Sequence, residues 1–463
     1  MNFKVDRFFE GLKNKRVAFA GIGVSHADTI RMFARRGIST VACDKRTRDE
    51  FDLALLTELE GLGVELRLGE SYLEGRDMDV LFRTPGMDFN MPRLMELRGM
   101  GVIVTSEVEV FLELCPCPVI GITGSDGKTT TTTLIAEMLQ AAGKTVHLGG
   151  NIGRALLPII DEITPSDLVV AELSSFQLMS VRTSPDIAVI TNMSPNHLDV
   201  HGTMEEYIAA KSNLYQHQGA FGITVLNEDN DITRSFKPHV RGQLRLFSRK
   251  GDVPGAWARD DAMICYSDIK GDTQELFPCA DIRLPGLHNV ENYLAAISAV
   301  WGLIPPEFMY KVAREFGGVE HRIEFVRELR GVKWYNDSIA TSPTRSVAGL
   351  RSFGQKLIMI AGGYDKKIPY EPLAPELVEH VKMLILMGAT AGQIESALLG
   401  FAGYDGSPKI VHAQNMEDAV AKASELAQAG DIVTLSPASA SFDMYPNFEV
   451  RGRHFKELVG GLD

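Results

Sequence analysis

The sequence predicts an α/β protein of three domains in series. Short apolar runs alternate with helical patterns along most of the chain, which is typical of sheets covered by helices. A chain of 463 residues is too long for one ordinary core and fits two to four domains. The predicted domains span residues 1–113, 114–319 and 320–463.

The N-terminal domain alternates strands with helices and is predicted to be Rossmann-like. Its predicted elements are strands at Arg16–Ala20, Ser39–Cys43, Asp79–Phe82 and Val102–Val104, and a helix at His26–Arg36. The turn Cys115-Pro-Cys117 marks the boundary that follows. The five cysteines are scattered and lack zinc-site spacing, so we expect neither a metal cluster nor a disulfide framework.

The central domain continues the alternation, and the C-terminal domain repeats it in a second Rossmann-like pattern. Central elements are predicted at Thr145–Leu148, Leu168–Glu172, Ile187–Thr191, Ile223–Leu226, His288–Leu303 and Glu307–Phe316. Residues 241–284 read as an antiparallel appendage. C-terminal strands are predicted at Lys356–Ala361, Met383–Met387, Lys409–His412 and Ile432–Leu435, with a helix over Asn415–Ala429 that Gly430 ends.

The segment GITGSDGKTTTTTLIAEM is interpreted as a phosphate loop, G-x-x-x-x-G-K-[ST], read from Gly121, Gly127, Lys128 and Thr129. It follows the apolar run Pro118–Ile122 and precedes a helical pattern, the setting that such a loop requires. Glycines let backbone N–H groups approach phosphate oxygens, the lysine supplies charge, and the threonine supplies a hydroxyl for Mg²⁺. The sequence therefore predicts an ATP-type nucleotide here.

Composition excludes several classes of function. Hydrophobic residues at 45% and charged residues at 23% describe a globular protein, and the net charge of −13 argues against a nucleic-acid partner. No apolar stretch reaches the length of a membrane span. We expect a cytoplasmic monomer with no membrane partner.

The N-terminal domain carries a weak nucleotide pattern, GIGVSH (Gly21–His26), followed by Asp44 at the end of the second strand. His26 stands where the third glycine of a dinucleotide fingerprint belongs. Either a nicotinamide cofactor or the nucleotide part of another ligand fits. The turn Thr84-Pro85-Gly86 follows a later strand and either cups a phosphate or is a plain turn.

Polar residues also follow strands of the central domain. Glu172 ends a strand, where open α/β sheets place ligands and where a carboxylate can hold Mg²⁺ opposite Thr129. His197 and Asp199 follow the next strand. A histidine there suits a metal or an acidic oxygen, although a loop histidine is often structural. Lys211 lies in a helical stretch and, from local sequence, reads as a solvated lysine.

An ordered set of motifs resembles the Mur ligase family. The motifs are TGSDGKTTT, GGNIG (Gly149–Gly153), ELSSFQL, NHLDVHGTMEEYIAAKSNLY, LPGLHNVEN and HRIE. The combination of GGNIG, ELSSFQL and the C-terminal LSPASASFDMYPNFEVRGRHFKEL resembles in particular the members that join D-glutamate to UDP-N-acetylmuramoyl-L-alanine. The resemblance implies that ATP phosphorylates a carboxylate and that the amine of D-glutamate attacks the acyl phosphate, releasing ADP and phosphate.

The resemblance also assigns site residues. It implies metal ligands at Thr129, Glu172, His197 and a carbamylated Lys211, for Mg²⁺ or alternatively Mn²⁺. The catalytic residues would be Lys128, Glu172, His197 and Lys211. The nucleotide site would comprise Gly124, Ser125, Asp126, Gly127, Lys128, Thr129, Thr130, Asn289, Asn292, His321, Arg322 and Asp337. Substrate contacts are expected at Ser25, Asp44, Thr84, Pro85, Gly86, Asn151, Ser174, Thr341, Lys366, Ser441 and Phe448.

Three departures from the family pattern stand out. Ile339 occupies the position of a lysine that many members place near the phosphates, so another group must supply that charge. His26 and Arg83 also depart from the pattern, at positions expected to contact the uridine and the diphosphate.

Four other functions remain as alternatives to the D-glutamate ligase. They are a sister ligase for another amino acid, a folylpolyglutamate synthetase-like ligase, a nucleotide-binding regulatory protein and an NAD-dependent enzyme.

Overall fold

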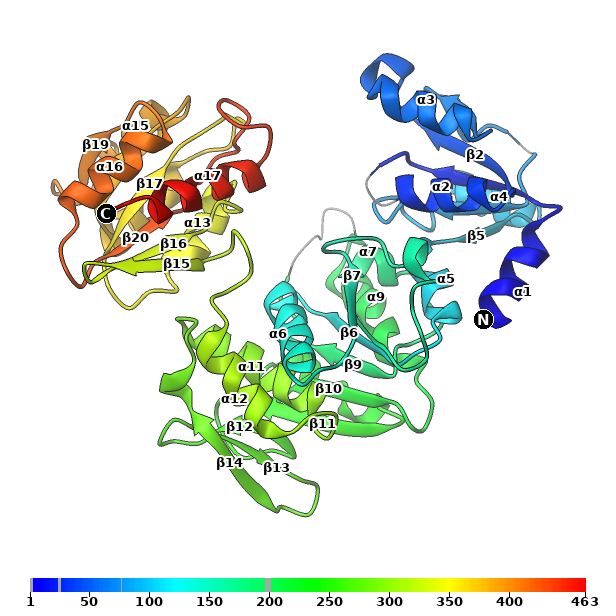
Figure 1. Cartoon of the computed structure of the whole chain (residues 1–463), viewed down its shortest axis with the longest axis horizontal. Helices are drawn as coiled ribbons and strands as arrows, with labels where there is room; N and C mark the ends of the chain where they lie inside the picture. The colour runs from blue at the N-terminus through cyan, green and yellow to red at the C-terminus, as the bar shows by residue number, and fades with distance from the viewer. Residues whose placement is uncertain (1–2, 24–25, 76, 196–200) are drawn as a thin grey trace. The chain divides into compact units, whose positions relative to one another are not determined.

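The computed structural model describes residues 3–23, 26–75, 77–195 and 201–463 (Figure 1). The chain forms two compact units, one of Met1–Cys279 with Glu291–Val312 and the other of Ala280–Val290 with Ala313–Asp463. The first unit contains two sheets and the second unit contains one. Parallel strands dominate all three sheets, which confirms the predicted α/β class.

The N-terminal sheet has the order β3-β2-β1-β4-β5, and all its strand pairs are parallel. Its strands are β1 (Arg16–Ala20), β2 (Ser39–Asp44), β3 (Glu65–Leu68), β4 (Val80–Arg83) and β5 (Ile103–Thr105). Its helices are α1 (Phe3–Leu12), α2 (Ala27–Arg35), α3 (Leu53–Gly61), α4 (Pro92–Gly99) and α5 (Glu107–Leu114). The strand order reverses between β1 and β4, and such sheets bind ligands at that point.

The central sheet has the order β14-β13-β12-β11-β10-β9-β6-β8-β7. Its strands are β6 (Val119–Thr123), β7 (Val146–Gly150), β8 (Leu168–Glu172), β9 (Ile187–Ile190), β10 (Ile223–Asn227), β11 (Gln243–Ser248), β12 (Gly255–Ala258), β13 (Met263–Ser267) and β14 (Thr273–Pro278). The predicted appendage is therefore wrong in part. β11 pairs parallel to β10 and β12 pairs parallel to β11, so they extend the main sheet, and only β13 and β14 are antiparallel.

Helices follow several strands of the central sheet, including β6. They are α6 (Lys128–Ala141), α7 (Ser175–Leu178), α9 (Met204–Gln216), α10 (Asp231–Arg234), α11 (Leu287–Val300) and α12 (Pro306–Glu315). Across the described part of the chain, no helix is both apolar enough and long enough to span a bilayer.

The C-terminal sheet has the order β15-β16-β20-β17-β18-β19. Its elements are β15 (Glu324–Leu329), β16 (Val332–Asn336), α13 (Pro343–Leu350), β17 (Leu357–Ala361), α14 (Ala374–His380), β18 (Val381–Leu386), α15 (Ala391–Leu399), β19 (Lys409–His412), α16 (Met416–Leu426), β20 (Ile432–Leu435) and α17 (Phe448–Gly460). The expected helix end at Gly430 is wrong. The Gly430 N–H donates to the Gly331 carbonyl (2.8 Å), so this glycine belongs to the turn that enters β20.

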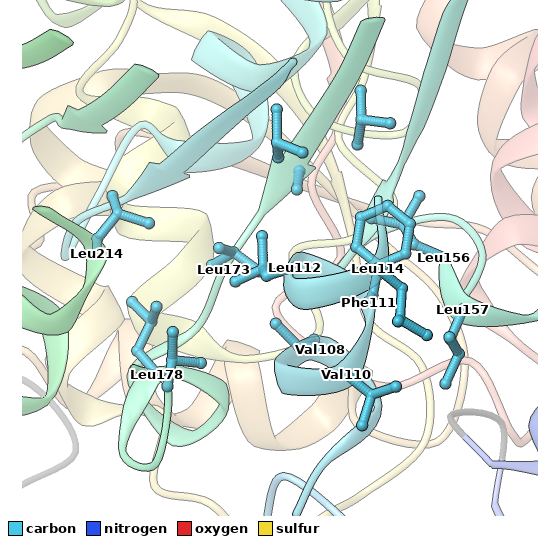
Figure 2. Packing of buried hydrophobic residues seen from close by; sticks show 14 of the residues in the cluster. Val108, Val110, Phe111, Leu112, Leu114, Leu156, Leu157, Leu173, Leu178 and Leu214 are labelled. Atoms are coloured by element: carbon cyan, nitrogen blue, oxygen red, sulfur yellow. The ribbon is translucent and has the colours of Figure 1, made fainter. Parts of the chain in front are cut away.

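Helix α5 connects β5 to β6 along the chain and packs an apolar face against residues of the central region. Figure 2 shows Val108, Phe111 and Leu112 of α5 beside Leu156 and Leu173. The first residue of the helix, Glu107, is buried, and its Oε1 accepts from the N–H groups of Leu156 (2.9 Å) and Leu157 (2.6 Å). Burial outweighs these hydrogen bonds and raises the pKa of Glu107 to about 7.

We expect Glu107→Gln to stabilise the protein at pH 8 and to have little effect below pH 5. The folded protein holds a proton on Glu107 that the unfolded chain releases near pH 4.5, so stability falls as pH rises from there toward 7. The difference in unfolding free energy between the variant and the wild type reaches at most about 3 kcal/mol and disappears at low pH. Melting temperatures of both proteins from pH 5 to 8 test this; a constant difference would contradict it.

Candidate functional site

The phosphate loop connects the buried strand β6 to helix α6. Gly121 lies within β6, and a Cβ there would meet the Pro185 side chain at 2.7 Å, so this glycine serves packing. Five residues separate it from Gly127, and reading it as the first glycine of the phosphate pattern was wrong. The first loop glycine is Gly124.

Gly124 and Gly127 adopt backbone conformations that only glycine adopts without strain. Their φ angles are +152° and +76°. A Cβ on Gly124 would lie 1.9 Å from Thr191 Oγ1, and one on Gly127 would lie 2.3 Å from Asn292 Oδ1. Helix α6 begins directly after Gly127, so its first N–H groups face the loop, as in anion-binding loops.

The end of β9 holds the loop in place. The Ser125 N–H donates to the Asn192 carbonyl (2.9 Å), and the Asp126 N–H donates to Asn192 Oδ1 (2.9 Å). Thr191 Oγ1 donates to the Asp126 carbonyl (2.6 Å). Asn192 is a site residue that the sequence analysis missed, because only the parallel pairing of β6 with β9 brings it to the loop.

Two lysines share one carbonyl oxygen of this loop. Lys128 Nζ donates to the carbonyls of Gly124 (2.9 Å) and Ser125 (3.0 Å). Lys211 Nζ, from helix α9, donates to the Gly124 carbonyl (2.8 Å) and to Thr123 Oγ1 (3.1 Å). The predicted lysines therefore meet at the carboxyl end of β6.

Lys211 is buried, with 2% of its surface exposed, so the reading as a solvated helix lysine is wrong. Burial and then the charge of Lys128 lower the pKa of Lys211 well below its ordinary value, while Glu172 and Asp126 act in the opposite direction. A neutral amine is the form that reacts with CO₂, whereas an ammonium does not. This environment fits the expected modification.

Glu172 lies at the end of β8, beside β6. Asn151 Nδ2 donates to Glu172 Oε1 (2.8 Å), and the Asn151 N–H donates to the Glu172 carbonyl (2.8 Å). Oε2 is buried, and no described group donates to it. A buried carboxylate oxygen without a donor is suited to a cation, so Glu172 fits the expected Mg²⁺ site.

The rest of the expected ligand set is incomplete in the described residues. His197 and Asp199 lie outside them, as does Ser25. Among the described residues, no three His, Cys, Asp or Glu side chains form a metal-binding group. Thr129 and Thr130 lie in the first turn of α6, and Ser174 caps α7 by accepting from the Gln177 N–H (3.3 Å).

Asn289 and Asn292 are both buried. Asn292 Oδ1 accepts from Thr131 Oγ1 (3.3 Å) and faces Gly127, which places it beside the phosphate loop. Asn289 Nδ2 donates to the Pro285 carbonyl (2.6 Å). Within the first unit, the structure thus brings Asn292 to the predicted nucleotide site.

The two turns of the N-terminal sheet lie against each other. A Cβ on Gly21 would lie 3.2 Å from Thr84 Cβ, and the Met87 N–H donates to the Thr84 carbonyl (3.0 Å), which closes the turn through Pro85 and Gly86. The structure therefore brings the predicted Gly21 and Thr84 segments together at the switch point.

Asp44 fixes the first of these turns. Its Oδ2 accepts from the Ile22 N–H (2.8 Å) and from Arg46 Nη2 (2.9 Å). Burial alone raises the pKa of Asp44, but the bonds from Arg46 and Ile22 outweigh it and hold the pKa below its ordinary value. Asp44 is therefore an ionised residue that orders the turn.

The two departures at His26 and Arg83 are both buried side chains. His26 is 1% exposed, its Nδ1 lies 3.1 Å from the Gly21 carbonyl, and burial lowers its pKa to about 4. The imidazole is therefore neutral and packs edge-on against Phe19, with ring centroids 5.6 Å apart. Arg83 is fully buried.

Three predicted residues of the second unit lie beside β15 and β16, Asp337 directly after β16 and His321 and Arg322 before β15. Asp337 accepts from Ser436 Oγ (2.9 Å) and from the Ile323 N–H (3.3 Å), and burial raises its pKa to about 7. His321 has φ +65° and lies 2.9 Å from Asn336 Nδ2, and Arg322 follows it. Burial also lowers the pKa of His321.

Lys366 lies in the loop after β17, and its Nζ donates to the carbonyl (3.3 Å) and Oγ1 (3.4 Å) of Thr341. Burial, followed by the charges of Arg345 and Arg451, lowers the pKa of Lys366. These cations suit an anionic ligand.

Arg451 is a site residue that the sequence analysis missed. It is 1% exposed and donates to the carbonyls of Ser338, Ser439 and Ala440 at 2.9–3.2 Å. These bonds hold α17, which begins at the predicted Phe448, against the segment that leads to the buried Ser441. The Phe448 carbonyl accepts from Ser338 Oγ (2.8 Å).

Comparisons with known proteins find similarity over most of the chain. Residues 122–300 match the Mur ligase middle domain, and residues 321–439 match the Mur ligase, glutamate ligase domain. The UDP-N-acetylmuramoylalanine–D-glutamate ligases of Acetivibrio thermocellus and Ruminiclostridium cellulolyticum are 50% and 47% identical, each over all of both chains.

Solved structures are similar in fold. A UDP-N-acetylmuramate–alanine ligase from Thermotoga maritima has a TM-score of 0.57 at 17% identity, covering 96% of this chain and 99% of its own. A pseudomurein peptide ligase type C from Methanothermus fervidus has a TM-score of 0.54 at 18% identity, covering 97% and 100%.

Proposed function

The chain belongs to the Mur ligase family, and we propose that it is an ATP-dependent ligase that joins D-glutamate to UDP-N-acetylmuramoyl-L-alanine in peptidoglycan precursor synthesis. ATP phosphorylates the alanine carboxylate, and the amine of D-glutamate attacks the acyl phosphate, which releases phosphate and leaves an amide. A carboxylate is a poor electrophile, and phosphorylation turns its oxygen into a leaving group.

The observation that carries this proposal is the convergence on Gly124. Lys128 and Lys211 both donate to its carbonyl, and Glu172 ends the neighbouring strand. Transfer of a phosphoryl group to a carboxylate brings two anions together, so the site needs cations held in position. Lys128 would supply one of them.

The residues present fit Mg²⁺ and a nucleotide triphosphate. Thr129 and Glu172 would hold one metal ion, His197 would hold a second, and carbamylated Lys211 would face a metal ion. Gly124–Thr130 with Asn292 would surround the phosphates. When bound, Mg²⁺ (or Mn²⁺) neutralises phosphate oxygens during transfer. Asn151 orients the Glu172 carboxylate for this task. Asn289, His321, Arg322 and Asp337 would contact the remainder of ATP.

We assign the two remaining substrates to different parts of the chain. The UDP end of the substrate would bind Asp44, Ser25 and the Thr84–Gly86 turn of residues 1–113, and Asn151 and Ser174 would approach its alanine end. D-glutamate would bind Thr341, Lys366, Ser441 and Phe448 of residues 320–463. ATP and UDP-sugars are cytoplasmic, so we place the reaction there, in a monomer with small-molecule partners.

An amino-acid panel tests the proposed function. With radiolabelled UDP-N-acetylmuramoyl-L-alanine, we expect ADP release only when D-glutamate is also present. Preference for L-alanine, a diamino acid or a folate acceptor would show that the protein has the activity of a related ligase instead. ATP consumption that depends on neither co-substrate would reject the ligase reaction, and tight nicotinamide binding would favour a dehydrogenase.

We expect Lys366→Ala to raise the KM for D-glutamate roughly tenfold to a hundredfold, because a charge-assisted bond to a carboxylate is lost. The KM for ATP should stay the same. Lys367→Ala is the matched control, since Lys367 is its exposed neighbour in the same loop. Equal effects of both substitutions on D-glutamate would contradict a specific contact of Lys366.

A further inference from the structure

Arg83 ends strand β4 and is fully buried, with 0% of its surface exposed. Its Nη1 donates to the carbonyls of Met87 (3.0 Å) and Pro85 (3.4 Å), both in the turn that follows β4. Its Nη2 donates to the Phe176 carbonyl (3.0 Å) and to Ser180 Oγ (3.1 Å). One guanidinium therefore holds the turn with one nitrogen and the α7 segment with the other.

The same cluster extends to the helix that links the two sheets. Ser180 Oγ donates to Glu109 Oε2 (3.0 Å), so Ser180 lies between Arg83 and a carboxylate of α5. Burial lowers the pKa of Arg83, and the charge of Glu109 acts against this shift. Burial likewise raises the pKa of Glu109. The pair is held apart by one hydroxyl, with no direct ion pair described between them.

Stability alone does not account for an arginine here. Burying a charge is expensive, and apolar side chains of similar volume often pack a core equally well or better. An arginine fork, in contrast, fixes two backbone segments at a defined distance and angle. The two segments that it joins are the Thr84–Gly86 turn and the helix capped by Ser174, which the proposed function assigns to opposite ends of one substrate.

We propose that Arg83 is a positioning residue that sets the Thr84–Gly86 turn relative to helix α7, so that one UDP-substrate molecule is held at both ends. This rests on the proposed function. A ligand that contacts both segments binds with higher affinity when their spacing is fixed, because once one end is bound the other end is held at a high effective concentration beside its own contact. Free UDP, which would contact only the turn, gains little from that spacing.

The test compares Arg83→Lys with Arg245→Lys. Arg245 is also a buried arginine of the first unit; its Nη1 donates to the carbonyls of Ser298 (2.9 Å) and Trp301 (3.0 Å). For each arginine, no described group accepts from Nε. Both changes keep the charge and remove the fork, but only one concerns the substrate segments.

Calorimetric titration with UDP and with UDP-N-acetylmuramoyl-L-alanine gives the readout. In Arg83→Lys, we expect the affinity for the whole substrate to fall roughly tenfold to a hundredfold and the affinity for UDP to fall about threefold at most. The KM for ATP should stay the same. Arg245→Lys should bind both ligands like the wild type.

Ser180→Ala keeps Arg83 and removes one acceptor of its hydrogen bonds. We expect this variant to lower the affinity for the whole substrate too, by a smaller factor than Arg83→Lys. This variant carries the test if Arg83→Lys does not fold. If affinity fell equally for UDP and for the whole substrate, or if neither variant lost affinity, the proposal would be overturned. Wild-type protein that binds neither ligand would reject the proposed function and this inference together.

Discussion

Replacing Lys211 with alanine should reduce ligase turnover by roughly a thousandfold or more, the scale on which preorganised charged groups act in such sites. Lys211 is 2% exposed and occupies the carboxyl end of β6 beside the phosphate loop. We expect acetate or bicarbonate to restore part of the activity, because a small carboxylate can enter the space that the side chain leaves. Initial rates across a range of acetate concentrations provide the measurement.

Lys144→Ala is the control, since this exposed lysine follows α6 and lies on the same unit. It should retain wild-type rates and show no response to acetate. Near-normal turnover of Lys211→Ala without any added carboxylate would show that the buried lysine is incidental to the reaction.

Replacing Lys128 with alanine should lower turnover by a similar factor, roughly a thousandfold. Lys128 Nζ reaches the Gly124 and Ser125 carbonyls, where a phosphate bound at the start of α6 would be within its range. The defect differs from that of Lys211→Ala, because what is lost is a cation. Acetate should therefore give no recovery.

Single-turnover rates with saturating ATP separate this effect from weaker nucleotide binding. A loss confined to the KM for ATP, with an unchanged turnover number, would mean that Lys128 binds the nucleotide equally in the ground state and the transition state.

Buried strands were the easiest elements to predict from the sequence. β1 and β8 match their predicted bounds, because their apolar runs are buried in the sheet. β3 was missed because its residues are exposed or half-buried and alternate charged with apolar side chains. β11 was assigned to an appendage because local punctuation does not reveal that a strand pairs parallel to β10.

The site was predictable where a local pattern carries the chemistry. The phosphate loop needs glycines, a lysine and a threonine in order, and these are visible in the sequence. Asn192 and Arg451 have no such signal, since Asn192 accepts from backbone N–H groups and Arg451 donates to backbone carbonyls that only the fold brings near. The burial of Lys211 was hidden for the same reason, and only the family resemblance pointed to its function.

The Gly124 carbonyl, which accepts from both lysines, has a consequence for the exchange of nucleotides. A phosphate that attracts the Lys128 ammonium competes for it with the carbonyl oxygen of Gly124, which lies in the loop just before the helix. When the phosphate departs, the ammonium can return to that oxygen without first becoming hydrated. Successive cycles then require only a short swing of one side chain, and the surrounding water has little to rearrange.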